Sequence, residues 1–121
     1  MGLTPLVSDP PYIRLSVVER IEPFALREEV SEVARSARGF LAAYKLSSGE
    51  PILMGRDPRS QKPWSHVRRN MINRHLLQAS KVEGTFWSPK GQPTRRHLML
   101  LMWAFTPTPE RTAAWLRTLP R

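Results

Sequence analysis

The stretch LMLLMWAF, residues 98–105, is the longest apolar run in the chain. A membrane-spanning helix needs about 18 or more such residues, so this run is too short to cross a bilayer and instead indicates a hydrophobic core. Its leucine and methionine content favours a helix over residues 95–105, with Thr94 as the N-cap. Because a helix that is apolar on nearly every side must be buried, we place this segment at the centre of the fold. The alternative is a strand paired with residues 82–87 through a hairpin at 88–93.

A second pattern, along residues 23–46, indicates the longest helix. Apolar residues recur there at steps of three and four, which is the spacing of one helix face. Pro23 suits the first position of a helix, where its missing N–H costs nothing. We expect the apolar face of this helix to pack on residues 98–105. That face consists of Leu26, Val30, Val33, Ala37, Phe40, Leu41 and Tyr44.

Shorter patterns supply the remaining elements. The alternation of Ile13, Leu15 and Val17 predicts a strand over residues 13–20. The rival interpretation is a helix that continues into the next element. The other expected elements are short strands at 52–54 and 82–87, a helix at 65–80 capped by Ser65, and a helix at 109–119 capped by Thr108.

These elements together predict the fold class. We expect an α+β, mostly helical architecture with about four helices and a small two- or three-stranded sheet. Residues 1–12 are rich in proline and are expected to form an extended N-terminal segment. A single compact, basic globular domain is expected over residues 13–121. Apolar surface left over on this domain would support a homodimer.

The 121-residue chain lacks residues that several chemistries need. It contains no cysteine, which excludes disulfide scaffolds, thiolate zinc sites and cysteine nucleophiles. Its sequence holds no glycine-rich phosphate loop, and residues 51–121 offer a divalent metal only three acids, Asp57, Glu83 and Glu110, on three separate elements. We therefore expect no cofactor and no enzymatic activity. The opening residues lack the basic and apolar regions of a signal peptide, so we expect a cytoplasmic protein that does not associate with a membrane.

The charge is distributed unevenly along the chain. With 19 basic and 10 acidic residues, the formal net charge is +9. Residues 1–50 carry six basic and seven acidic side chains, so the whole positive excess lies in residues 51–121. A coding bias toward arginine would explain arginine in place of lysine, but it would not explain the loss of acidic residues after Glu50. This balance indicates a polyanionic partner, bound where cations from distant stretches gather in one continuous patch.

One group of candidate residues lies on the helix expected at 65–80. Arg69, Asn70, Asn73 and Arg74 share a polar sector of about 140° at 100° per residue. Arginine binds phosphate or guanine, and asparagine can pair with adenine in the major groove of DNA. The ordinary alternative is a charged helix face that only contacts solvent.

A second group lies in residues 88–97. Lys90 occupies a tight turn, and Arg95 and Arg96 occupy the first turn of the following helix. Basic residues there oppose the helix dipole, which indicates that an anion is expected at this position. The alternative is salt bridging of these arginines to the acidic residues Glu28, Glu29 or Glu32.

A third group lies in the proline-punctuated loop before Trp64. Arg56, Arg59 and Lys62 alternate there with proline, as in a flexible arm that follows a nucleic-acid backbone. Trp64 and Trp87 are candidates for stacking on bases. For each tryptophan, packing in the core is the alternative.

Three functions are compatible with these groups. The first is a small basic nucleic-acid-binding protein, a regulator or a subunit of a nucleoprotein complex, that contacts the phosphates of DNA or RNA. The second is a protein-interaction module, an inhibitor or adaptor, that docks its basic face on an acidic partner protein. The third is a metal-independent ribonuclease that uses His66 or His97.

Overall fold

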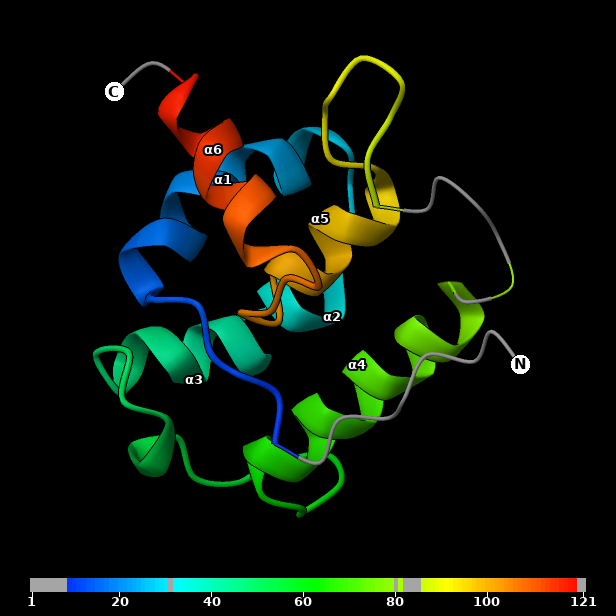
Figure 1. Ribbon diagram of the computed structural model, residues 1–121. Coiled ribbons are helices and arrows are strands. Elements are labelled where there is room, and N and C mark those ends of the chain that lie inside the picture. Colours follow the sequence, from blue (N-terminus) through cyan, green and yellow to red (C-terminus); the bar gives the residue numbers. More distant parts are fainter. Residues whose placement is uncertain (1–8, 31, 80, 82–85, 120–121) are drawn as a thin grey trace.

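The computed structural model describes residues 9–30, 32–79, 81 and 86–119. Every regular element in these residues is helical (Figure 1). Four elements lie in the first half of the chain: α1 (Leu15–Arg27), α2 (Glu32–Arg35), α3 (Phe40–Leu46) and the 3-10 helix η1 (Pro51–Leu53). They are followed by α4 (Trp64–Ala79), α5 (Arg95–Leu101) and α6 (Pro109–Arg117).

The predicted α+β class is wrong, because no strand forms in the part of the chain that the structure describes. Only two isolated bridges occur there, between Arg56 and Pro63 and between Trp87 and Pro93. Each bridge closes a loop and adds no second pair, so neither extends into a sheet. Residues 52–54 fall in and just after η1, and residues 82–85 lie outside the described residues.

The strand predicted for residues 13–20 is also replaced by a helix. Helix α1 begins at Leu15, and its buried residues are Val18, Ile21 and Ala25, at steps of three and four. This spacing spans Pro23, which therefore lies inside α1 rather than at a helix start. The rival interpretation, a helix continuing into the next element, is the correct one here.

The long helix predicted for residues 23–46 is broken into three. Helix α1 ends at Arg27, and Glu29 adopts a left-handed conformation with a φ of 54°. A second break comes at Gly39, which is the N-cap of α3 in extended conformation. Part of the predicted stripe still reaches the core: Phe40, Leu41 and Tyr44 are buried from α3, and Val30 is buried from the connection between α1 and α2.

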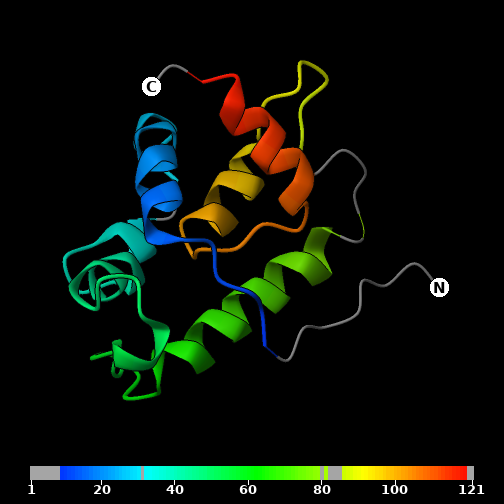
Figure 2. The ribbon, with the colours of Figure 1, turned by 60° about the vertical axis from the view of Figure 1, so that its left-hand side comes forward.

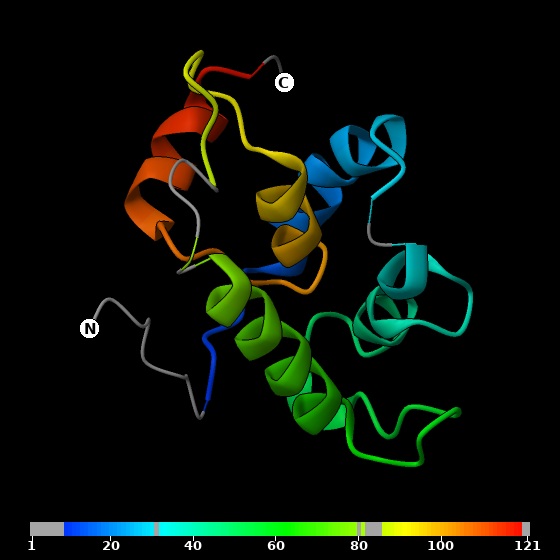
Figure 3. The ribbon, with the colours of Figure 1, turned by 90° about the vertical axis from the view of Figure 1, so that its right-hand side faces the viewer.

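Helix α5 lies between α1 and α6, and α4 runs below it (Figures 2 and 3). The packed helix pairs include α1 with α5 and α4 with α5. The run 98–105 lies at the centre of this arrangement, with most of its side chains buried as expected. Helix α5 ends at Leu101, and residues 102–105 continue as an irregular buried segment in which Ala104 has a φ of 58°.

An aromatic cluster joins this central run to the rest of the core. The ring of Phe40 lies 5.2 Å from that of Trp103 and 6.1 Å from that of Trp64. Tyr44 stacks on Phe40 at 5.6 Å. The start of α4, through Trp64, and α3, through Phe40 and Tyr44, thus meet in one aromatic cluster, which sets their relative positions.

Among the helices described here, none has both the length and the apolar composition that a transmembrane segment requires. The run 98–105, although apolar throughout, is divided between α5 and the segment that follows it.

Candidate nucleic-acid interface

Helix α4 has one buried side and one exposed side. Its buried residues are Trp64, Arg68, Ile72, Leu76 and Ala79, which recur at steps of three and four. Their burial fixes the rotation of the helix, and the opposite side must therefore face solvent. Asn70 and Arg74 are exposed on that side, and Arg69 and Asn73 are partly exposed.

Arg68 is the residue that sequence reasoning did not place. It is only 1% exposed, and its guanidinium donates to four backbone carbonyls. The acceptors belong to Pro10 and Pro11, before α1, and to Trp103 and Ala104, after α5, at 2.6 to 2.9 Å. The guanidinium also lies 3.7 Å above the ring of Tyr12. A single side chain thus ties α4 to the N-terminal segment and to the central core run.

Burial lowers the pKa of Arg68 to about 10, while the neighbouring Tyr12 acts in the opposite direction. The side chain therefore remains charged at neutral pH. Its position could have been recognised in the sequence, because it stands four residues after Trp64 and four before Ile72, on the buried arc of the helix. Because Arg69 follows it directly, Arg68 was instead grouped with the charged residues of the helix.

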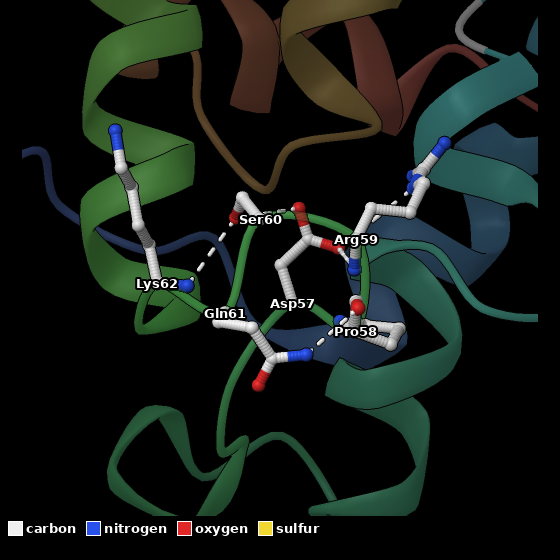
Figure 4. A network of polar contacts seen from close by, with 6 residues as sticks. All are labelled: Asp57, Pro58, Arg59, Ser60, Gln61 and Lys62. Carbon is white, nitrogen blue, oxygen red and sulfur yellow. Dashed lines mark hydrogen bonds and ion pairs between the residues drawn. The ribbon is translucent and has the colours of Figure 1, made fainter.

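The loop before α4 is closed on itself rather than extended as an arm (Figure 4). Its centre is Asp57, which is 6% exposed. The carboxylate of Asp57 accepts hydrogen bonds from the backbone N–H of Arg59 and the hydroxyl of Ser60, both at 3.0 Å. The side chains of Arg59 and Lys62 point away from each other, and that of Lys62 extends alongside α4. Lys62 is exposed and lies two residues before the start of α4.

The other two loop cations have local partners. The guanidinium of Arg56 donates to the carbonyl of Gln61 at 2.9 Å. That of Arg59, which is exposed, lies 3.8 Å from a carboxylate oxygen of the buried Asp57, a long ion-pair distance.

The two arginines at the start of α5 point to different neighbours. Arg95 donates to the backbone carbonyl of Glu28 and lies 3.5 Å from its carboxylate, so the salt-bridging alternative describes this residue. Arg96 instead donates to the side chain of Gln78, at 3.1 Å, and to the carbonyl of His75, at 3.4 Å. Both acceptors belong to α4, so Arg96 adds its charge to the C-terminal end of that helix.

The predicted residues therefore divide into two sets. We define the α4 basic face as the cations and amides on the exposed side of α4 together with the cations at its two ends, which are Arg69, Asn70, Asn73 and Arg74 on the helix, Lys62 before its start and Arg96 against its last turns. The remaining residues lie elsewhere. Arg56 and Arg59 belong to the closed loop, Lys90 is exposed in the turn between Ser88 and Gly91, and Arg95 contacts α1.

The three histidines occupy different environments. His97 is fully buried, and its ring contacts the carbonyl of Phe86 and the hydroxyl of Thr106 at 3.0 and 2.9 Å. Burial, and then the charges of Arg96 and Arg74, lower the pKa of His75. His66 is partly exposed and lines a hollow of about 330 Å³ together with Arg69. In the described residues, no three histidine or carboxylate side chains converge where a metal ion could bind.

Both candidate stacking residues pack in the interior. Trp64 is 3% exposed and belongs to the aromatic cluster, so its faces are covered. Trp87 is partly buried, with its indole N–H donating to Thr108 at 3.0 Å and the guanidinium of Arg111 lying 4.6 Å above its ring. Packing, the alternative to base stacking, describes both.

The chain was also compared with known proteins. No family model, no curated protein sequence and no solved structure matches it. Functional arguments for this protein therefore rest on the geometry described above.

Proposed function

We propose that this chain is a small nucleic-acid-binding protein that contacts the phosphates of DNA or RNA through the α4 basic face. One observation carries the proposal: a 16-residue helix, fixed in rotation by a buried arginine, presents arginines and asparagines on its exposed side with no acid among its residues. The acid-free stretch extends beyond the helix, from Pro58 to Val82.

The arrangement suits a phosphate backbone. Each arginine that neutralises a phosphate releases condensed counterions, which favours binding at low salt. Arg69 and Arg74 are separated by about 7.5 Å along the helix axis at 1.5 Å per residue. An α-helix also fits the DNA major groove, about 12 Å wide, where Asn70 and Asn73 could contact adenine.

The ribonuclease has weaker support. A ribonuclease that uses His97 would need that ring to reach a phosphate, and the ring is fully buried. His66 is then the remaining histidine candidate, without a histidine partner in view. A regulator and a nucleoprotein-complex subunit are both compatible with the proposed binding, and a cytoplasmic location belongs to the same proposal.

Charge reversal on α4 tests the proposal. We expect Arg69→Glu with Arg74→Glu to weaken binding to duplex DNA, single-stranded DNA or RNA at least about tenfold, measured by gel shift at two salt concentrations. The slope of log affinity against log salt should also fall by about 2, because two phosphate contacts are lost at about 0.9 each. Both side chains lie on the solvent side of α4, so the fold should persist.

The matched control is Arg14→Glu with Arg117→Glu, which changes the net charge equally at two exposed positions outside α4. We expect this control to keep the wild-type salt slope. An equal loss of affinity and slope in both variants would show diffuse attraction to net charge, against a site on α4. The absence of any shift at low salt would reject nucleic-acid binding, and RNA shortened in the presence of a chelator would favour the ribonuclease.

A further inference from the structure

A second surface, separate from the α4 basic face, includes residues of the loop before α4. An open groove of about 330 Å³ runs between α3, η1 and the start of α4, which lie at the same end of the molecule (Figure 1). Its apolar lining is formed by Ala43, Leu46, Leu53, Met54, Pro58 and Trp64.

The rim of this groove exposes large apolar side chains to an unusual extent. Leu46, which is 88% exposed, and Leu53, which is 68% exposed, line the groove, and Ile52, the neighbour of Leu53 in η1, is 90% exposed. Exposed leucines are ordinary when they are scattered, but three in one place mark a surface that contacts something else. These residues make no contribution to the core that would explain their identity.

The groove is a built feature of the fold. Its floor is Trp64, which is 3% exposed and packed on Phe40 and Trp103. The turn between α3 and η1 is tight, with Ser48 and Gly49 both in left-handed conformation. A Cβ atom at Gly49 would lie 3.2 Å from the Cβ atom of Leu15, so this turn is pressed against α1. The chain therefore holds Ile52 and Leu53 outward from a packed base.

The charge around the groove selects between possible occupants. Arg38 and Arg56 line it, both are exposed, and the lining contains no acidic residue. Arg38 has no hydrogen bond or ion pair to any other described residue, and Arg56 contacts only a backbone carbonyl. A second copy docked face to face would bring these arginines opposite each other, which disfavours a symmetric dimer. An acidic occupant would pair with them.

We propose that this groove binds a short acidic, amphipathic helix of a partner protein. Its apolar side chains cover Leu46, Ile52 and Leu53, and its carboxylates pair with Arg38 and Arg56. This is the groove mode of helix recognition, in which apolar anchors give affinity and flanking charges give orientation. The groove does not include the α4 basic face, so this inference stands independently of the proposed nucleic-acid binding.

A designed peptide tests the proposal on the full chain. The probe is a fluorescein-labelled helix of about twelve residues with leucine at positions i, i+4 and i+7 and glutamate and alanine elsewhere. Its comparison peptide has lysine in place of every glutamate. By fluorescence anisotropy, we expect the acidic peptide to bind at least about tenfold more tightly than the lysine peptide.

Variants locate the binding. We expect Leu46→Ser with Leu53→Ser, and separately Arg38→Glu with Arg56→Glu, to weaken acidic-peptide binding at least about tenfold. Leu26→Ser is the matched control, because Leu26 is 61% exposed on α1 and does not line the groove, and it should leave the affinity unchanged. Arg69→Glu with Arg74→Glu should also leave it unchanged. Circular dichroism confirms that each variant is folded.

Three results would overturn the proposal. The first is equal affinity for the acidic and lysine peptides, and the second is no binding of either. The third is a dimer in sedimentation that Leu46→Ser with Leu53→Ser converts to a monomer, since the occupant would then be a second copy of this chain. Failure of the gel-shift experiment on α4 would affect none of these readouts.

Discussion

Replacement of Arg68 by alanine is expected to lower the free energy of unfolding by about 3–5 kcal/mol. Two losses add together. The side chain is among the largest fully buried ones, so its truncation leaves a cavity in the core. Its removal also takes the guanidinium donors from the carbonyls of Pro10, Pro11 and Trp103, while that of Ala104 retains the N–H of Ile13 at 2.8 Å.

An opposing effect must be weighed against these losses. Burial disfavours the cation, which is why the pKa of Arg68 is lowered to about 10. Removing the charge would recover that penalty, about 1.4 kcal/mol for each pKa unit. The donors must nevertheless be supplied, because an unsatisfied buried carbonyl costs about 1–3 kcal/mol. Because Arg68→Ala leaves several carbonyls without a donor and also creates a cavity, we expect these losses to exceed the recovered desolvation penalty.

Two further substitutions separate the contributions. Arg68→Met restores most of the volume without any donor, so its stability should fall between those of the wild type and Arg68→Ala. Arg68→Lys keeps the charge but has only one side-chain nitrogen. In the wild type, three different guanidinium nitrogens each donate to a different carbonyl, and a single ammonium group cannot reach all of these acceptors. It should therefore also be destabilised.

Urea unfolding, followed by tryptophan fluorescence, measures these differences. The matched control is Arg74→Ala, on the exposed side of the same helix, for which we expect a change within about 0.5 kcal/mol. Equal midpoints for Arg68→Ala and Arg74→Ala would show that the buried hydrogen bonds are not what holds α4 in place. If Arg68→Ala shows no cooperative unfolding transition, the loss of stability is large enough to unfold the variant without urea.

The same residue illustrates how far sequence reasoning reached. The central run 98–105 was predictable because it is apolar at every position, and the faces of α4 followed from helical spacing. The hydrogen-bond partners of the buried Arg68 could not be predicted from helical spacing. Its acceptors belong to residues 10–11 and 103–104, far apart in the sequence, and only the tertiary fold shows that these carbonyls converge on one side chain of α4.

The errors in the first half of the chain have a physical cause. Ile13, Leu15 and Val17 alternate as in a strand, and the β-branched side chains of Ile13 and Val17 favour extended structure. The residues that the core buries are instead Val18, Ile21 and Ala25, and packing overrides local preference. Prediction of one helix over 23–46 failed at two places, at Glu29, which is in left-handed conformation, and at Gly39, which is in extended conformation and forms the N-cap of α3.

The candidate interface was predictable only in its local part. The exposed side of α4 depends on helix geometry, which sequence spacing describes well. The partners of Arg95 and Arg96 are long-range, because they lie 67 and 18 residues away along the chain. Glu28 was one of the acids considered as a partner of Arg95. Nothing in the local pattern indicated Gln78 as a partner of Arg96.

Acidification from neutral pH to about pH 4 is expected to lower the free energy of unfolding by about 3 kcal/mol through His97 alone. Burial, opposed by the hydrogen bond to Phe86 and assisted by the charge of Arg111, lowers the pKa of this ring to about 4. In the unfolded chain the ring titrates near its ordinary pKa of 6.5. Between these values the unfolded chain binds the extra proton, so stability is full above about 6.5 and falls as the pH decreases toward 4.

The hydrogen bonds around His97 explain why the proton is excluded. The carbonyl of Phe86 can only accept, so Nδ1 carries the hydrogen and donates to it. Nε2 must then accept from the hydroxyl of Thr106, which in turn accepts from the hydroxyl of Thr112 at 2.8 Å and the N–H of Thr108 at 3.2 Å. A proton on Nε2 removes the acceptor that ends this chain and introduces a charge beside Arg111 in a buried site.

Urea unfolding across this pH range, for the wild type and His97→Gln, isolates the contribution. His97→Gln should be less stable at neutral pH, because glutamine cannot make both ring contacts, and its stability should decline less between about pH 6.5 and pH 4. His75→Gln is the matched control. The pKa of His75 is lowered as well, but its ring is only partly buried, so this variant should retain most of the wild-type slope. Identical slopes for the wild type and His97→Gln would show that His97 does not carry the acid response.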